Sequence, residues 1–187
     1  MSQKPVDPTL LRRDLGSFVT GVTIVTTRTT AGEPVGLTVN SFNTVSLVPP
    51  LVLWSLSLRA ASYDAFAQAS HFAVNVLAAD QRALSDRFAK TGGEKFNGLA
   101  WREGIAGLPI LEGTAASFQC RHSARHPGGD HIIFIGEVLA HESSGRPPLV
   151  YARGRYAEAR EVPESKQAPS VSVLPVAEQR SAGGGKK

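Results

Sequence analysis

The chain has 187 residues, of which 42% are hydrophobic and 19% charged, and its formal net charge is +4. This length suits one globular domain of roughly 150 residues with tails and excludes two catalytic domains. The sequence has no apolar run of about 18 residues, so we expect no membrane span. Its basic residues are scattered and form no stripe with interleaved aromatic residues, so nucleic-acid binding is not expected.

The amino-terminal segment and the cysteine content indicate where the protein works. Residues 1–7 lack the basic start and the apolar stretch of a secretory signal. The single cysteine, Cys120, cannot form the intramolecular disulfide that small secreted domains usually carry. We therefore expect a cytoplasmic protein. Cys120 lies in an apolar strand without an activating neighbour, which favours inert packing over a nucleophilic role.

The first elements are a helix and a hairpin. A short helix is predicted from Asp7 to Gly16, because an N-cap residue precedes Pro8 at the first helical position. A Thr-rich alternation then predicts a strand, and a glycine-bearing loop joins it to a second strand. The two strands and their loop are expected at residues 22–27, 34–40 and 29–33.

The middle of the chain combines strands with two short helices. Pro49 and Pro50 exclude helix and cannot donate ladder hydrogen bonds, so a new buried strand is expected to begin after them. The Ser62 hydroxyl is predicted to cap one helix, and Asp80 the other. The strands are expected at residues 51–56 and 72–77, and the helices run to about residues 69 and 89.

Two long strands, at residues 115–121 and 132–140, are predicted to meet across a turn at residues 126–129. Strands outnumber helices and their connections are short, which favours an antiparallel barrel over alternating parallel units. The domain is expected to span residues 1–160. Residues 161–187 are rich in Pro, Ser, Gln and Gly, and we expect them to form a disordered tail.

Small neutral polar residues accompany apolar ones in two segments, at residues 36–42 and 55–57, and a Gly-Asp-His triplet follows at residues 129–131. An isoalloxazine ring is flat, apolar on its faces and hydrogen-bonding along one edge. It therefore needs hydroxyl, amide and backbone donors beside an apolar wall. The first two segments supply that mixture, and together the three are typical of a flavin pocket.

At these residues the chain resembles the flavin reductase-like, FMN-binding split-barrel family, the short-chain NAD(P)H:flavin oxidoreductases that serve two-component monooxygenases. The resemblance implies a mostly β protein with a Greek-key split β-barrel and a few short helices. It also implies a homodimer with flavin in a groove near the dimer interface. The matching stretches are residues 36–42 with Ser46, 49–53, 72–77, 88–90 with 95–96, 129–131 and 136–138.

The resemblance and the residue chemistry together give a set of expected cofactor-binding residues. Hydroxyl, amide and backbone groups of residues 38–41 could bond the pyrimidine edge of the ring, although these residues could instead face solvent on a strand. Ser55 and Ser57 share one side of a strand, with Trp54 on the other, so both could line the same groove. The alternative is an edge strand whose serine face is simply exposed to solvent. The full set is Thr38, Val39, Asn40, Ser41, Ser55, Leu56, Ser57, Ser62, Phe88, Lys90, His131 and Tyr156.

The cations and rings in this set have competing interpretations. Ser62 could hold a phosphate at a helix start or serve as a simple N-cap. Lys90, with Arg59, is a candidate for the phosphates of flavin or of the nicotinamide nucleotide. Phe88 lies near the flavin or fills the core. By resemblance His131 contacts the nicotinamide nucleotide, and Tyr156 is placed at the same rim.

No residue is expected to act as a catalytic acid or base, because hydride passes directly from nicotinamide to flavin N5 and requires stacking. No metal is expected either: on a strand His122 and His126 would lie about 13 Å apart, too far to share one ion. The sequence carries no Walker loop and no Rossmann fingerprint.

The sequence therefore predicts an NAD(P)H-dependent flavin reductase that reduces FMN or FAD and supplies a separate oxygenase. Two alternatives stay open, namely a flavin carrier or sensor without reductase activity and a flavoenzyme that reduces another acceptor, such as a quinone. The choices between FMN and FAD, and between NADH and NADPH, also stay open.

Overall fold

The computed structural model describes residues 5–162, and the predicted tail beyond residue 162 lies outside the described residues. Over that range the protein is mostly β, with helices α1 (Pro8–Leu15), α2 (Tyr63–Gln68) and α3 (Arg82–Ala89) and a 3-10 turn at Ile105–Gly107. The strands are β1 (Thr20–Gly21), β2 (Thr23–Arg28), β3 (Pro34–Val39), β4 (Asn43–Leu47), β5 (Pro50–Ser57), β6 (His71–Val76), β7 (Trp101–Glu103), β8 (Pro109–Leu111), β9 (Ala116–Gly128), β10 (His131–Ser143), β11 (Leu149–Ala152) and β12 (Arg155–Glu158).

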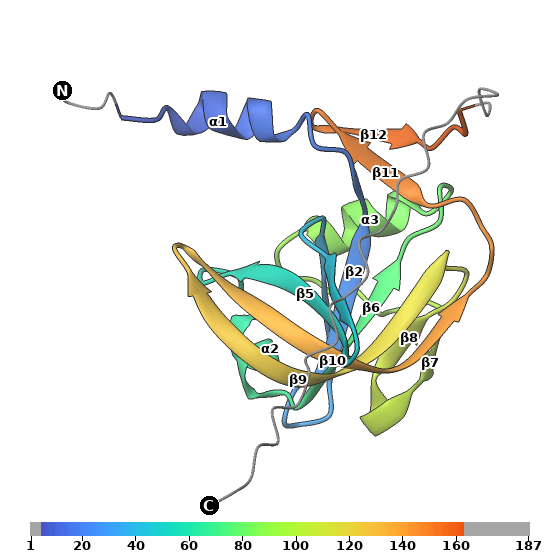
Figure 1. Ribbon diagram of the computed structural model, residues 1–187. Helices are drawn as coiled ribbons and strands as arrows, with labels where there is room; N and C mark the ends of the chain where they lie inside the picture. The colour runs from blue at the N-terminus through green and yellow to red at the C-terminus, as the bar shows by residue number, and fades with distance from the viewer. Residues whose placement is uncertain (1–4, 163–187) are drawn as a thin grey trace, which may run out of the picture.

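Seven strands form one antiparallel sheet in the order β3-β2-β6-β9-β10-β5-β4. The sheet is strongly curved, and β9 and β10 sweep across the molecule (Figure 1). The Ser41 hydroxyl, just past β3, donates to the Ser55 carbonyl at 3.1 Å and accepts from the Ser55 N–H at 3.0 Å. These bonds connect the β3 end of the sheet to β5, the strand next to the opposite edge.

The core lies inside this curve. Trp54 stacks on Phe134 with ring centroids 4.9 Å apart, and Phe66 and Phe72 pack edge-on against the same indole. Burying each such ring stabilises the fold by roughly 1.5–3 kcal/mol. Along β5 the side chains alternate: Trp54 and Leu56 are buried, while the intervening and following serines are partly exposed, which confirms the predicted two-sided strand.

The helix starts differ from one another in how they are capped. The Asp7 carboxylate accepts from the N–H of Thr9 at 2.7 Å and of Leu10 at 3.3 Å, which confirms the predicted cap of α1. The prediction that Ser62 caps its helix through the hydroxyl was wrong, because that hydroxyl makes no capping bond to α2. The prediction for Asp80 was also wrong: α3 begins one residue later, after Gln81.

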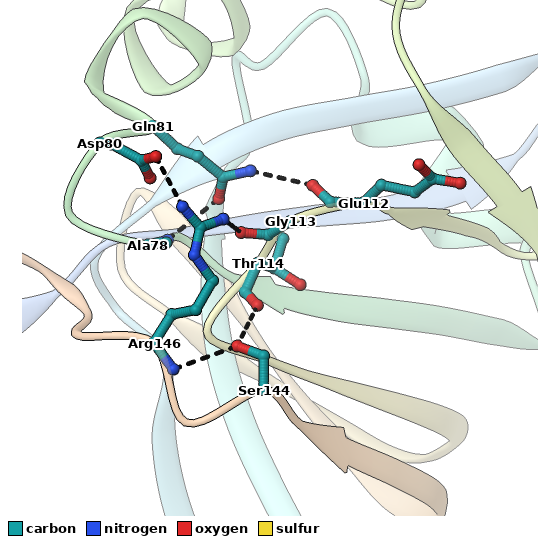
Figure 2. Close-up of polar contacts among 8 residues, drawn as sticks. All are labelled: Ala78, Asp80, Gln81, Glu112, Gly113, Thr114, Ser144 and Arg146. Atoms are coloured by element: carbon teal, nitrogen blue, oxygen red, sulfur yellow. Dashed lines mark hydrogen bonds and ion pairs between the residues drawn. The ribbon is translucent and has the colours of Figure 1, made fainter.

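A cluster of polar side chains fixes the start of α3 (Figure 2). Gln81 accepts from the N–H of Ala78 at 3.0 Å and donates to the Glu112 carbonyl at 2.9 Å. Arg146 pairs with Asp80 at 2.6 Å and also reaches a main-chain carbonyl, so the Asp80 carboxylate serves an ion pair instead of a cap. This α3 anchor cluster consists of Ala78, Asp80, Gln81, Glu112, Gly113, Thr114, Ser144 and Arg146.

The long hairpin turns later than the sequence predicted. β9 continues to Gly128, and the turn consists of Gly129, with φ at +74°, and Asp130. Pro127 favoured an earlier turn. Beyond Arg121, however, β9 pairs with β10 alone, and a strand with one open edge tolerates proline.

No helix within residues 5–162 has the length and apolarity that a membrane crossing requires.

Candidate functional site

A cleft of about 580 Å³ opens beside β3. Three segments line it: residues 33–38 on β3, residues 60–62 at the start of α2, and residues 88–97, which leave the end of α3. We call it the β3 cleft. It brings together four of the expected cofactor-binding residues: Thr38, Ser62, Phe88 and Lys90.

The wall of the β3 cleft depends on a glycine. A Cβ atom at Gly36 would stand 2.8 Å from the Phe88 ring and 3.2 Å from a methyl group of Thr26, so the missing side chain lets Phe88 lie directly on β3. Phe88 is only 1% exposed and packs edge-on against Phe96, with ring centroids 5.2 Å apart. Phe88 therefore supports the cleft wall from the core side.

Thr38 lines the cleft but its hydroxyl is already engaged. It donates to the carbonyl of Ser85 in α3 at 2.7 Å. From the other side of the helix, the Tyr156 hydroxyl donates to the Asp86 carboxylate at 2.7 Å and shares a 2.9 Å hydrogen bond with the Ser85 hydroxyl. Burial, reinforced by Asp86, raises the pKa of Tyr156. Thr38 thus offers a ligand its main chain and methyl group.

Tyr156 and His131, which the sequence assigned to one rim, lie on different elements, and neither lines the β3 cleft or the second cleft described below. Tyr156 lies on β12 against α3, whereas His131 is the first residue of β10; both strands are labelled in Figure 1. The Tyr156 hydroxyl connects the β11–β12 hairpin to α3.

A second cleft, of about 810 Å³, lies past the end of β3. Asn40 and Ser41 line it, so the predicted segment 38–41 passes from one cleft to the other. Asn40 is exposed, and the Ser41 hydroxyl is engaged with the Ser55 main chain. The remaining lining comes from α1 and the loop after it, from residues 42–43 and from Asp130, Tyr151 and Gly154.

The other expected residues lie along the β5–β10 ladder. His131 pairs in register with Ser57, whose hydroxyl accepts from the Arg59 N–H at 3.3 Å. The Leu56 side chain is buried and points into the core, so Leu56 can contribute only its main chain to a ligand. Ser55, which pairs with Ile133 on this ladder, is partly exposed, and so is Val39, which lies elsewhere as the last residue of β3.

His131 is oriented by its neighbour. Its Nδ1 atom lies 2.7 Å from the Asp130 carboxylate. The hydrogen bond from His131, together with its charge and that of Arg59, lowers the pKa of Asp130. This pairing fixes the imidazole and leaves its other nitrogen for a ligand.

Lys95 is a functional candidate that the sequence did not single out. It lines the β3 cleft, and its ammonium donates to the Phe88 carbonyl at 3.0 Å and lies 3.4 Å from the Gly36 carbonyl. Burial lowers its pKa. The sequence did point to this position, because the Lys95-Phe96 pair is one of the stretches that match the flavin reductase-like family. Lys90 also lines this cleft, but Arg59 does not.

Outside the clefts, Cys120 is positioned for packing and not for chemistry. Cys120 is fully buried, and burial raises the pKa of its thiol to about 12, in keeping with inert packing. Among residues 5–162, no three His, Cys, Asp or Glu side chains come together in a way that could hold a metal ion.

His122 on β9 is partly exposed, but both its ring nitrogens are buried, and neither has a hydrogen-bond partner among the described residues. Its ring packs between Phe72 and Phe134, with centroids 4.9 and 5.1 Å away. Burial, followed by the charges of Arg125 and His71, lowers its pKa to about 4. A neutral imidazole therefore fills this position at neutral pH.

Taken together, the two clefts define the class of protein. The β3 cleft combines small residues such as Gly36 and Ser62 with the cations Lys90 and Lys95. The second cleft is lined mainly by apolar and aromatic side chains, with Asn40, Ser41 and Asp130, the neighbour that orients His131. Such a surface can hold a flat ring and a phosphate, and it suits chemistry that depends on positioning. These features describe a β protein that binds a nucleotide cofactor without a Rossmann unit.

Comparisons with known proteins agree. A family model described as "Flavin reductase like domain" matches residues 15–160. The chain belongs to this family. It is 48% identical over 145 residues to the FMN reductase (NADH) SmoA of Agrobacterium fabrum, covering 78% of this chain and 82% of SmoA.

Other relatives extend the comparison. The chain is 40% identical over 157 residues to HsaB, the reductase subunit of a flavin-dependent monooxygenase of Rhodococcus jostii, covering 83% of this chain and 80% of HsaB. It spans only 50% of a probable flavin reductase of Rhizobium meliloti, to which it is 44% identical over 156 residues. An NADH:FAD oxidoreductase of Streptomyces globisporus, solved with NAD and FAD fragments, superposes with a TM-score of 0.77 at 36% identity, over 87% of this chain and 99% of that one.

Proposed function

We propose that the protein is an NAD(P)H-dependent flavin reductase that transfers hydride from a nicotinamide nucleotide to FMN or FAD. The observation that carries the proposal is the β3 cleft, which gathers the predicted residues Thr38, Ser62 and Lys90 in a chain of the flavin reductase family. Relatives named as an FMN reductase (NADH) and as an NADH:FAD oxidoreductase support the same activity.

The residues present fit a flavin. We assign a phosphate to Lys90 and Ser62, which both line the β3 cleft. Main-chain groups of residues 38–41, with the Asn40 amide, supply donors for the ring edge, and Ser55, Leu56 and Ser57 continue this polar surface on β5. His131, held by Asp130, is assigned to the nicotinamide nucleotide.

A bound flavin supplies the chemistry, because its N5 atom accepts a hydride. The protein's contribution is positioning: it binds both nucleotides, orients one ring against the other and limits the access of water. Neutral polar donors along one edge of the cleft stabilise the negative charge that grows on a reduced ring. Proximity of this kind is worth several orders of magnitude in rate.

The assembly we propose is a homodimer of split barrels, each formed by residues 1–160. The Ser41–Ser55 bonds, which join the two ends of the sheet, support barrel closure. Large apolar side chains stand in solvent in two segments: Phe18 is 72% exposed, Leu47 88% and Val48 92%. Exposed apolar groups on this scale mark protein contacts. The second cleft borders Phe18, so a partner subunit would complete its wall.

The reduced flavin is assigned to a separate oxygenase component, and the reaction to the cytoplasm. The HsaB relative, named as the reductase subunit of a flavin-dependent monooxygenase, supports the assignment to an oxygenase. The choice between FMN and FAD, and between NADH and NADPH, is left to the experiment.

The test is an anaerobic titration of purified protein plus FMN or FAD with NADH and, separately, with NADPH, following the visible flavin absorbance. Rapid catalytic bleaching with at least one pair is the expected result, and it also selects both nucleotides. Tight flavin binding without bleaching would contradict the reductase proposal in favour of a carrier.

A further inference from the structure

The segment at residues 90–97 forms one wall of the β3 cleft and carries Lys90. Its tip is sparsely packed: Gly92 and Gly93 have φ angles of +74° and +79°, and a Cβ atom at either would meet nothing within 4 Å. Residues 90–94 are exposed. The position of Lys90 over the cleft therefore depends on what holds the base of this loop.

Two cations hold the base of the loop from opposite sides. Lys95 reaches inward, donating to the Phe88 carbonyl at the end of α3 and lying 3.4 Å from the Gly36 carbonyl on β3. Arg87 reaches outward from α3 and donates to the carbonyls of Glu94 at 3.0 Å and Asn97 at 2.5 Å. Lys95 lines the cleft, whereas Arg87 does not.

We propose that Lys95 is a positioning residue of the reductase: its ammonium ties the 90–97 loop to α3 and β3, and this attachment sets the affinity of the β3 cleft for flavin. The inference rests on the proposed flavin site. It extends that proposal, because it assigns flavin affinity to a lysine that acts through the loop and leaves the phosphate to Lys90.

The geometry favours this role over a phosphate contact. An ammonium has three N–H donors, and two of those of Lys95 are directed at carbonyls of two different elements. The Phe88 carbonyl belongs to the last turn of α3, where the helix dipole favours a cation. Loss of the ammonium would free the loop base while leaving the Phe88–Gly36 contact in place.

The experiment compares Lys95→Met, Lys95→Arg and Arg87→Met with the wild-type protein. Arg121→Met serves as the control, because Arg121 pairs with Glu137 at 2.6 Å on the exposed β9–β10 surface, outside both clefts. The measurements are the dissociation constant for FMN, the KM for the nicotinamide nucleotide, and hydrogen–deuterium exchange of the loop without flavin.

For Lys95→Met we expect an FMN dissociation constant about tenfold higher, the size of effect that loss of a charge-assisted hydrogen bond produces. Loop exchange should be faster in the flavin-free protein, and the KM for the nicotinamide nucleotide should change little. Arg87→Met should shift affinity and exchange in the same direction. Lys95→Arg should recover part of both, and Arg121→Met should change neither.

Two results would overturn the inference. Weaker FMN binding by Lys95→Met with unchanged loop exchange, and no effect of Arg87→Met, would show that Lys95 contacts the flavin itself. Unchanged FMN binding would show that the attachment has no influence on the site. Failure of the wild-type protein to bind or reduce flavin would instead contradict the proposed function, so the two failures are distinguishable.

Discussion

The two ends of α3 are held in different ways. At its start, the α3 anchor cluster joins side chains and carbonyls from three separate loops, and the side chains of Gln81 and Arg146 are each bonded to two partners (Figure 2). At its other end, a glycine-bearing loop is attached mainly through Lys95 and Arg87. The densely bonded end faces no proposed ligand, and the sparsely bonded end lines the β3 cleft.

This contrast shows how one short helix can serve both stability and binding. Each side chain to main chain hydrogen bond contributes about 1 kcal/mol net, so the anchor cluster fixes the helix axis. A loop held at its base and open at its tip can adjust to a ligand at low cost in free energy. Changes at the first end should therefore alter stability, and changes at the second should alter flavin binding.

The largest effect is expected at the wall between the helix and β3. Gly36→Val should weaken flavin binding by at least about 100-fold and cost about 1–3 kcal/mol in unfolding free energy, because the new side chain displaces the buried Phe88 ring. FMN titration and thermal melting would measure both effects. The matched control is Gly21→Val, where a Cβ atom meets nothing within 4 Å. Normal FMN affinity in Gly36→Val would break the assignment of this wall to the site.

The anchor cluster should respond in stability alone. Gln81→Leu leaves the N–H of the buried Ala78 without its acceptor, which should cost about 1–3 kcal/mol in unfolding free energy. Denaturant unfolding should show this loss, while the FMN dissociation constant stays within about twofold of wild type. A large change in FMN affinity at unchanged stability would contradict the claim that the start of α3 serves stability and only its end serves binding.

His122 lies at neither end of α3, but it makes the unfolding free energy depend on pH. Its pKa is about 4 in the folded chain against an ordinary 6.5, so the unfolded chain binds a proton that the folded chain refuses. His122 therefore lowers the free energy of unfolding only below about pH 6.5, and this loss grows as the pH drops toward 4, to about 1–3 kcal/mol. His122→Phe, which keeps an aromatic ring between Phe72 and Phe134, should lose this part of the pH dependence. An unchanged acid profile of unfolding would contradict the account.

The smallest effect is expected at the tip of the loop. Lys90 is exposed, so Lys90→Met should raise the dissociation constant for FMN by a factor of about 2–5, most clearly at low salt. Binding of riboflavin, which lacks the phosphate, should be unaffected. Equal weakening for both ligands would assign Lys90 to the ring instead of the phosphate.

Local features of the fold could be predicted from sequence. The α1 cap, the first hairpin and the two faces of β5 all follow from contacts between residues close in the chain. The short strands β1, β4, β11 and β12 were not predicted, because strands of two to five residues with little burial carry no clear alternation. The hairpin turn was misplaced because the open edge of β9 that tolerates Pro127 depends on where β6 ends.

The residues of the site also fall into those that sequence motifs predicted and those whose roles depend on distant partners. The ordered motifs brought Thr38, Ser62, Phe88 and Lys90 to one cleft, as the resemblance implied. Lys95 and Tyr156 could not be placed, because their roles depend on partners in other elements: the carbonyls of Phe88 and Gly36 for the lysine, and Ser85 and Asp86 for the tyrosine.

The central claim is that the β3 cleft holds the flavin, and a crystal structure of the protein with FMN tests it most directly. The account predicts the phosphate between Lys90 and Ser62, with the ring edge along residues 38–41. FMN bound on any other surface, with the β3 cleft empty, would contradict it.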